Sequence, residues 1–206
     1  LLENGADVSA ANNDGETALL VALLEGNLDV VEPLLEKGAN ANAKNKSGET
    51  ALHIAAVVGS SAAMEVLLKQ EPIEVNAADN RGLTPLHLSA ALGRLLPEEI
   101  QARDHRAVVE LLATHGGDVT AEDNEGWTPI HRAAVPGEDE NGDVVEPDVG
   151  IINFLAENGA DLNHADKDGA TPTYIVAQNG HVNVVRFLAD NGDNHHQPRK
   201  HGATPT

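Results

Sequence analysis

Ten histidines are the side chains of this 206-residue chain best suited to acid–base or metal chemistry. Three of them, His53, His87 and His131, each stand three residues after a threonine. This recurrence indicates a structural role, because a stacking element appears once in every repeat of a pattern. We therefore predict that these imidazoles form hydrogen bonds across the turn between repeats, and that they neither bind a metal nor perform catalysis.

A second group of histidines, His195, His196 and His201, lies with Asp193 near the C-terminus. Imidazole clusters can bind zinc. The spacing here matches no standard zinc site, and the stretch spans the turn of a repeat. We expect no metal at this position.

Residues 137–148 contain six acidic side chains and no basic one. Asp139, Asn141 and Asp143 alternate as at the start of an EF-hand calcium loop. The glycine that such a loop requires after its third ligand is replaced by Val144, and no Glu stands at the twelfth position. We therefore expect an acidic, solvated loop.

The sequence motifs of the common catalytic centres are absent. The chain has no cysteine, and it contains no GxSxG, GxxxxGK[ST], HExxH or GxGxxG pattern. Those patterns hold a nucleophile, a phosphate group, a zinc ion or a dinucleotide in fixed geometry. We predict that the chain is not an enzyme and that it has no cofactor.

The charge of the chain argues against two classes of binding partner, and its composition indicates the type of core. Lys plus Arg number 13 against 33 Asp plus Glu, a formal net charge of −20. We therefore expect neither nucleic acids nor anionic membranes as partners, because both are bound through cations. Aromatic residues make up only 2%, so the core must consist of Ala, Leu and Val, which suits closely packed helices better than a β-sandwich.

The N-terminal residues and the length of the apolar stretches indicate the cellular compartment in which we expect the protein. They lack the basic start and apolar run of a signal peptide, and no apolar stretch approaches the roughly 20 residues that span a bilayer. We expect a cytoplasmic protein, with the nucleus, or the host cytosol for a secreted effector, as alternatives. Since the chain does not begin with Met, we expect it to be a piece of something longer.

The chain repeats itself. Six threonines follow a Gly-x pair at spacings of 33, 34, 44, 43 and 33 residues; they are Thr17, Thr50, Thr84, Thr128, Thr171 and Thr204. A glycine follows nine residues after each of the first five, at Gly26, Gly59, Gly93, Gly137 and Gly180. Such a period indicates an array of small structural units.

Each part of the repeat has a physical role. Thr-Pro pairs such as Thr84-Pro85 combine an N-cap with proline at the first helical position. The following Ala-rich turn, as in residues 52–56, lets a neighbouring helix approach closely, and the glycine ends the helix. Apolar doublets then recur at helical spacing and predict a second helix. Polar turns such as residues 79–82 lead to the next threonine.

GLTPLHLSAALG (82–93), GETALHIAAVVG (48–59) and LAENGADLNHADKDGATP (155–172) resemble ankyrin repeats. The resemblance covers nearly the whole chain and implies one all-α solenoid, with stacked helix-turn-helix repeats linked by β-hairpin-like loops. The expected frames are a half-repeat at 1–11, the start of a further repeat at 199–206, and five repeats between them at 12–44, 45–78, 79–122, 123–165 and 166–198.

The sequence departs from the repeat at four places. Extra residues follow Gly93 and Gly137 in the turn between the two helices of repeats three and four. For the first insertion we predict a lengthened second helix over 96–113, and for 137–146 a mobile loop. Pro33 should make its helix begin near Asp29, with a capping box from Asp29 to Glu32, or kink there. Thr173-Tyr174 replaces the usual Leu-His, which should loosen that helix start.

In ankyrin-like proteins the partner contacts the hairpin tips and the ends of the first helices. The resemblance therefore implies a non-enzymatic scaffold whose concave face binds another protein. The apolar contacts expected on this chain are Val57, Val58, Leu83, Leu92, Trp127 and Val135. The charged contacts expected around them are Arg81, Asp14, Glu16, Glu25, Glu49 and Glu125. An apolar centre with an acidic rim predicts a partner with apolar anchors and basic flanks.

Trp127 is the expected centre of this site. It is the only Trp, the equivalent residues of the other repeats are not aromatic, and Trp is a frequent interface anchor. The alternative is that its ring lies along neighbouring hairpins, over Leu83 or the stem of Arg81.

Two other functions stay open. The array could recruit substrate for a larger enzyme or secreted effector whose catalytic domain lies elsewhere. It could also be a substrate itself, because Asn76 and Asn163 hold the hairpin position at which ankyrin-like repeats are hydroxylated.

Overall fold

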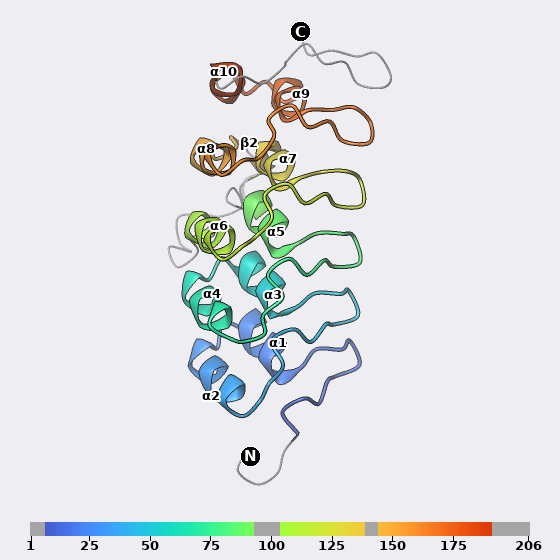
Figure 1. Ribbon diagram of the computed structural model, residues 1–206, viewed down its shortest axis with the longest axis vertical. Coiled ribbons are helices and arrows are strands. Elements are labelled where there is room, and N and C mark those ends of the chain that lie inside the picture. The colour runs from blue at the N-terminus through green and yellow to red at the C-terminus, as the bar shows by residue number, and fades with distance from the viewer. Residues whose placement is uncertain (1–6, 93–103, 139–143, 191–206) are drawn as a thin grey trace.

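The computed structural model describes residues 7–92, 104–138 and 144–190. Helix pairs stack along one axis, with the hairpin loops projecting from one side of the stack (Figure 1). The first helices of the pairs form an inner layer beside the hairpins: α1 (Ala18–Leu24), α3 (Ala51–Val58), α5 (Pro85–Leu92), α7 (Pro129–Ala134) and α9 (Pro172–Gln178). The second helices form an outer layer: α2 (Val31–Glu36), α4 (Ser61–Leu68), α6 (His105–Thr114), α8 (Val149–Glu157) and α10 (Val182–Asp190). The predicted all-α solenoid is confirmed.

The inner helices begin where the threonines predict. Thr17 accepts a hydrogen bond from the Leu20 backbone N–H, and Thr171 accepts one from Tyr174. Proline is the first residue of α7 and α9, where its missing N–H breaks no hydrogen bond. Because α9 begins in the same register as the others, Thr173-Tyr174 changes the side chains of this start and not its position.

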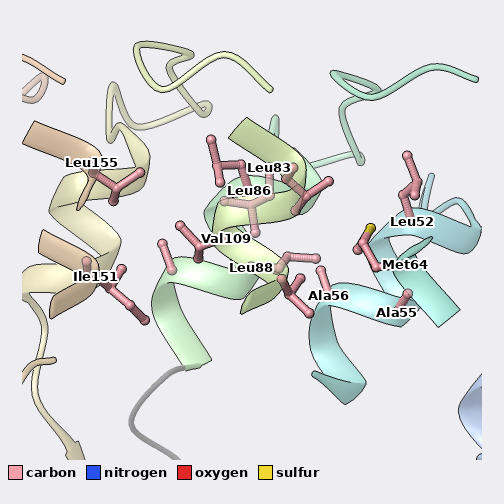
Figure 2. Close-up of a cluster of buried hydrophobic side chains, with 14 of the residues drawn as sticks. Leu52, Ala55, Ala56, Met64, Leu83, Leu86, Leu88, Val109, Ile151 and Leu155 are labelled. Carbon is pink, nitrogen blue, oxygen red and sulfur yellow. The ribbon is translucent and has the colours of Figure 1, made fainter. Parts of the chain in front are cut away.

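Small and aliphatic side chains form one core along the stack. Ala55 and Ala56 have no exposed surface, which lets neighbouring helices approach closely. Met64, Leu86 and Ile151 fill the space between the layers (Figure 2). The near absence of aromatic residues therefore matches a core built from short helix-to-helix distances.

The segment around Pro33 is broken. A 3₁₀ helix spans Leu28–Val30, and α2 follows at Val31 and ends at Glu36, with Pro33 in its first turn. The predicted capping box from Asp29 to Glu32 is wrong, because neither helix start has a side-chain cap. The break itself agrees with the prediction, since proline is tolerated only where its missing N–H is not needed.

The two insertions differ from their predictions. Asp104 accepts a hydrogen bond from the Ala107 backbone N–H and caps α6, so this helix begins at His105 and not near Pro97. Residues 93–103, which include the start of the predicted 96–113 helix, lie outside the described residues. The second insertion is not simply a loop, because β1 (Gly137–Glu138) and β2 (Val144–Val145) pair as antiparallel strands.

In the described ranges, no helix is both long enough and apolar enough to cross a membrane.

Candidate functional site

The hairpin tips are shaped by one Asn or Asp in each repeat. Its side-chain Oδ1 accepts hydrogen bonds from the backbone N–H groups two and four residues later, at 2.7–3.0 Å. These residues are Asn12, Asn45, Asp79, Asp123 and Asp166. The sequence reasoning missed them, although each stands five residues before a capping threonine.

Neighbouring tips are joined by a ladder of backbone hydrogen bonds. The N–H of Lys46 donates to the carbonyl of Asp14 at 2.9 Å, and the N–H of Asn80 donates to that of Ser47 at 3.0 Å. The same bond joins Asn124 to Arg81 and Lys167 to Glu125, at 2.9 and 3.1 Å. Each hairpin therefore has a fixed place beside the next, and the tips form a row along one side of the stack (Figure 1).

The three repeated histidines tie each repeat to the following one. Nδ1 of His53, His87 and His131 lies 2.9 Å from Oγ1 of the capping threonine three residues earlier. Nε2 lies 3.0, 2.9 and 3.3 Å from the backbone carbonyls of Leu83, Trp127 and Ala170 in the next hairpin. The predicted hydrogen bonds across the turn are confirmed.

These contacts define the protonation state of the imidazoles. A carbonyl oxygen can only accept, so Nε2 carries the proton, and Nδ1 accepts from the threonine N–H. Burial lowers the pKa of all three histidines, because a buried cation loses its hydration. The pKa of His131 falls to about 4. The bridges therefore consist of neutral imidazoles.

Trp127 is held by its neighbours. Its indole N–H donates to Oδ2 of Asp166 at 2.9 Å, and the guanidinium of Arg132 lies 4.8 Å from its ring centre. Arg132 also forms an ion pair with Asp123. The half-buried ring therefore joins the fourth hairpin to the fifth, and its role as the centre of the binding site stays a prediction.

The Asp123 carboxylate at the centre of this group is ionised. Burial acts to raise its pKa, but hydrogen bonds from Arg132 and from the N–H groups of Trp127 and Glu125 outweigh burial, so its pKa is lowered. Its charge is therefore compensated inside the protein, as a buried carboxylate requires.

Replacing Trp127 with alanine is expected to lower the free energy of unfolding by about 2 kcal/mol, less than for a fully buried Trp. The substitution removes packing and leaves the Asp166 carboxylate without its indole donor. Trp127→Phe should recover part of the loss, since the ring returns without the N–H. Urea unfolding measures both variants, and an unchanged midpoint for Trp127→Ala would show that the ring does not support the fold.

The predicted contact residues differ in exposure. Asp14, Glu25, Val57, Arg81 and Glu125 are exposed, and Glu16, Glu49, Val58, Trp127 and Val135 are half-buried. Leu83 is only 4% exposed and belongs to the core, because its side chain points into the stack and not out of the hairpin. It is removed from the candidate site. Leu92 is the last residue of α5, and its side chain lies outside the described residues.

Among the inner-helix side chains that the structure describes, the exposed apolar ones lie in the first two repeats. Leu24 and Val57 occupy equivalent positions at the ends of α1 and α3, and they are 43% and 37% exposed. Leu24 lies in the row predicted from the repeat, at the end of a first helix. Val57 belongs to the predicted apolar centre, from which the buried Leu83 is removed, and the binding role of the other members stays a prediction.

Asn76 joins two repeats through both ends of its amide. Its Nδ2 donates to the Gly116 carbonyl at 2.8 Å, and its Oδ1 accepts from the Asp118 N–H at 2.8 Å. Asn42 makes the same pair of contacts with Pro72 and Glu74. These asparagines are therefore part of the stack, and hydroxylation of Asn76 or Asn163 stays untested.

Within the described part of the chain, no three His, Cys, Asp or Glu side chains come together as metal ligands. The histidine cluster with Asp193 lies outside the described residues, as do Asp139, Asn141 and Asp143.

Comparison with protein families accounts for most of the chain. A model described as ankyrin repeats (many copies) matches residues 1–55 and 34–89, and one described as ankyrin repeats (3 copies) matches 143–206. A single ankyrin repeat model matches 81–124. The chain belongs to the ankyrin repeat family. No curated protein sequence matches it.

Membership of the ankyrin repeat family gives the site its general class. Ankyrin repeats are generally protein–protein interaction modules and typically non-catalytic. Residues 125–142 fall between the family matches, and they contain Trp127 and the first part of the second insertion. The helix α7 within this stretch keeps the cap and the histidine bridge of the other repeats.

Proposed function

We propose that this ankyrin array is a non-enzymatic scaffold that binds another protein on the concave face of its first two repeats. The observation that carries the proposal is the exposed apolar pair Leu24 and Val57, one on each inner helix. A large aliphatic side chain gains no free energy from folding while it stays in water. Side by side on a rigid surface, such residues can serve as anchors for a partner.

The charges around this pair indicate the chemistry of the partner. Asp14, Glu16, Glu25 and Glu49 belong to the same two repeats, where Lys46 is the one basic residue of the hairpin tips. Complementary charge speeds association and selects among partners more than it deepens affinity. We therefore expect a partner segment with apolar anchors flanked by Lys or Arg.

Leu24→Glu and Val57→Glu are expected to weaken partner binding at least tenfold each, a loss of about 1.4 kcal/mol. The charge would occupy the position of an apolar anchor and would have to lose its hydration in the complex. A partner captured from cell extract with the tagged chain is titrated against each variant by isothermal calorimetry.

Val182→Glu serves as the matched control, because Val182 is 64% exposed on α10 in the outer layer. It should bind the partner as the unmodified chain does. Equal losses in all three variants, or no loss at Leu24 and Val57, would rule out this face as the binding surface. Circular dichroism melting confirms that each variant folds.

A further inference from the structure

The outer helices α2 and α4 lie on the side of the stack away from the hairpins (Figure 1). A groove lined by residues of these two helices and of the 3₁₀ turn before α2 runs between them. It consists of two hollows of about 360 and 260 Å³. Glu32 and Val66 line both hollows, so the two are continuous. The apolar part of the lining consists of Leu28, Val31, Leu35, Ala62, Ala63 and Val66.

The lining residues follow one face of each helix. On the side formed by the 3₁₀ turn and α2, the lining residues recur at positions 28, 32 and 35. On the α4 side they recur at 62, 66 and 69. This is the three- and four-residue spacing of a single helix face. The groove therefore extends along the eight residues of α4, which span about 12 Å at 1.5 Å per residue.

The broken outer helix at Pro33 gives this groove its apolar entrance. Leu28 lies in the 3₁₀ turn before α2 and is 38% exposed, whereas its equivalent in α4 is Ser61. A leucine held at an open position does not contribute its full side chain to the core. Leu28 is thus available for contact with a second molecule.

Acidic side chains surround the apolar lining. Asp29, Glu32 and Glu36 line the groove and are exposed, against one basic residue, Lys69. Across residues 7–92, none of these three carboxylates forms an ion pair with another described residue. A second copy of the chain, at a net charge of −20, would be repelled.

We propose that this groove docks a basic amphipathic protein segment. One or two apolar side chains of the segment pack on Leu28, Ala62 and Val66. Lys or Arg side chains beside them pair with Asp29, Glu32 and Glu36. The docking site is separate from the concave face, so the array presents two binding surfaces on opposite layers.

The test selects ligands directly. A display library of random 12-residue peptides is selected on the folded chain, and each recovered peptide is titrated by fluorescence anisotropy. We expect a class of peptides in which Lys or Arg flanks leucine or an aromatic residue, and whose binding depends on the groove. Ala62→Arg should weaken these peptides at least tenfold, because Ala62 is exposed and the new side chain fills the hollow with positive charge.

A matched pair of charge reversals separates the groove from general electrostatics. Glu32 and Glu65 hold equivalent positions on α2 and α4 and both are exposed, but only Glu32 lines the groove. Glu32→Arg should weaken the groove-dependent peptides by roughly three- to tenfold, while Glu65→Arg, with the same change in net charge, should leave them within twofold.

Three results would overturn the proposal. They are recovery of no binding peptides, equal effects of Glu32→Arg and Glu65→Arg, and binding that survives Ala62→Arg but is lost with Val57→Glu. The last would assign the peptides to the concave face and leave the proposed function intact. If Ala62→Arg abolishes peptide binding and Val57→Glu leaves it unchanged, the result supports the groove independently of the concave face.

Discussion

Replacing Gly82 with alanine is expected to lower the free energy of unfolding by about 3 kcal/mol, through backbone strain together with a clash. Gly82 has a φ of +80°, which a side chain with a Cβ rarely adopts. The added Cβ would lie 2.8 Å from the backbone nitrogen of Asn124 and 2.7 Å from its Oδ1. Because Asn124 belongs to the next hairpin, the substitution should force two repeats apart.

Gly38 provides the control for this prediction. Its φ is +88°, but an added Cβ would meet nothing within 4 Å. Gly38→Ala should therefore cost only the strain of the left-handed backbone, about 1 kcal/mol. The difference between the two variants in urea unfolding measures how closely the hairpins pack. Equal destabilisation would show that the hairpin ladder contributes nothing beyond local strain.

Acid is expected to destabilise the array before its buried carboxylates are protonated. His131 is neutral in the folded protein, with a pKa of about 4 against an ordinary 6.5, so the unfolded chain binds a proton first as the pH falls. The stability associated with the neutral form is complete above pH 6.5 and is lost progressively down to about pH 4. At pH 5 the loss from His131 alone is about 2 kcal/mol.

His53 and His87 act in the same direction, since burial lowers their pKa as well. The lowered pKa of Asp123 acts only at lower pH, because its stabilisation is lost as pH falls below the ordinary value of 3.8. Urea unfolding at pH 7, 6 and 5 measures the slope of stability against pH.

Substitutions at two histidines test the source of this slope. His131→Gln should be less stable than the unmodified chain at pH 7 but lose less stability between pH 7 and 5. His115→Gln removes an exposed histidine at the end of α6 and should retain the full slope. A slope unchanged by His131→Gln would contradict the neutral bridge.

The features that were predicted correctly depend on residues close in sequence. The capping threonine and the histidine three residues later lie on the same helical turn, so their recurrence identified both the helix starts and the bridges. The Asn or Asp five residues before each threonine carries an equally local signal. This signal does not single out the hydrogen bonds by itself, because Asn and Asp are frequent in turns of many kinds.

The errors arose where the outcome depends on a neighbouring repeat. Leu83 and Trp127 hold the same position in successive repeats, one residue before the capping threonine. Yet Leu83 is buried in the stack, whereas Trp127 is held by Asp166 and Arg132. Similarly, nothing in the composition of 96–113 showed that Asp104 would cap α6. Packing against the neighbouring repeat decides these features, and the periodicity of the sequence carries no information about that packing.

Hydrogen exchange in the complex with the captured partner tests the concave binding face most directly. The account predicts that the partner slows exchange in the first two hairpins, at 13–16 and 46–49, and at the helix ends 24–25 and 57–58. The outer helices α8 and α10 should exchange as in the free chain. Protection confined to the outer layer, with unchanged exchange at these hairpins and helix ends, would contradict the account.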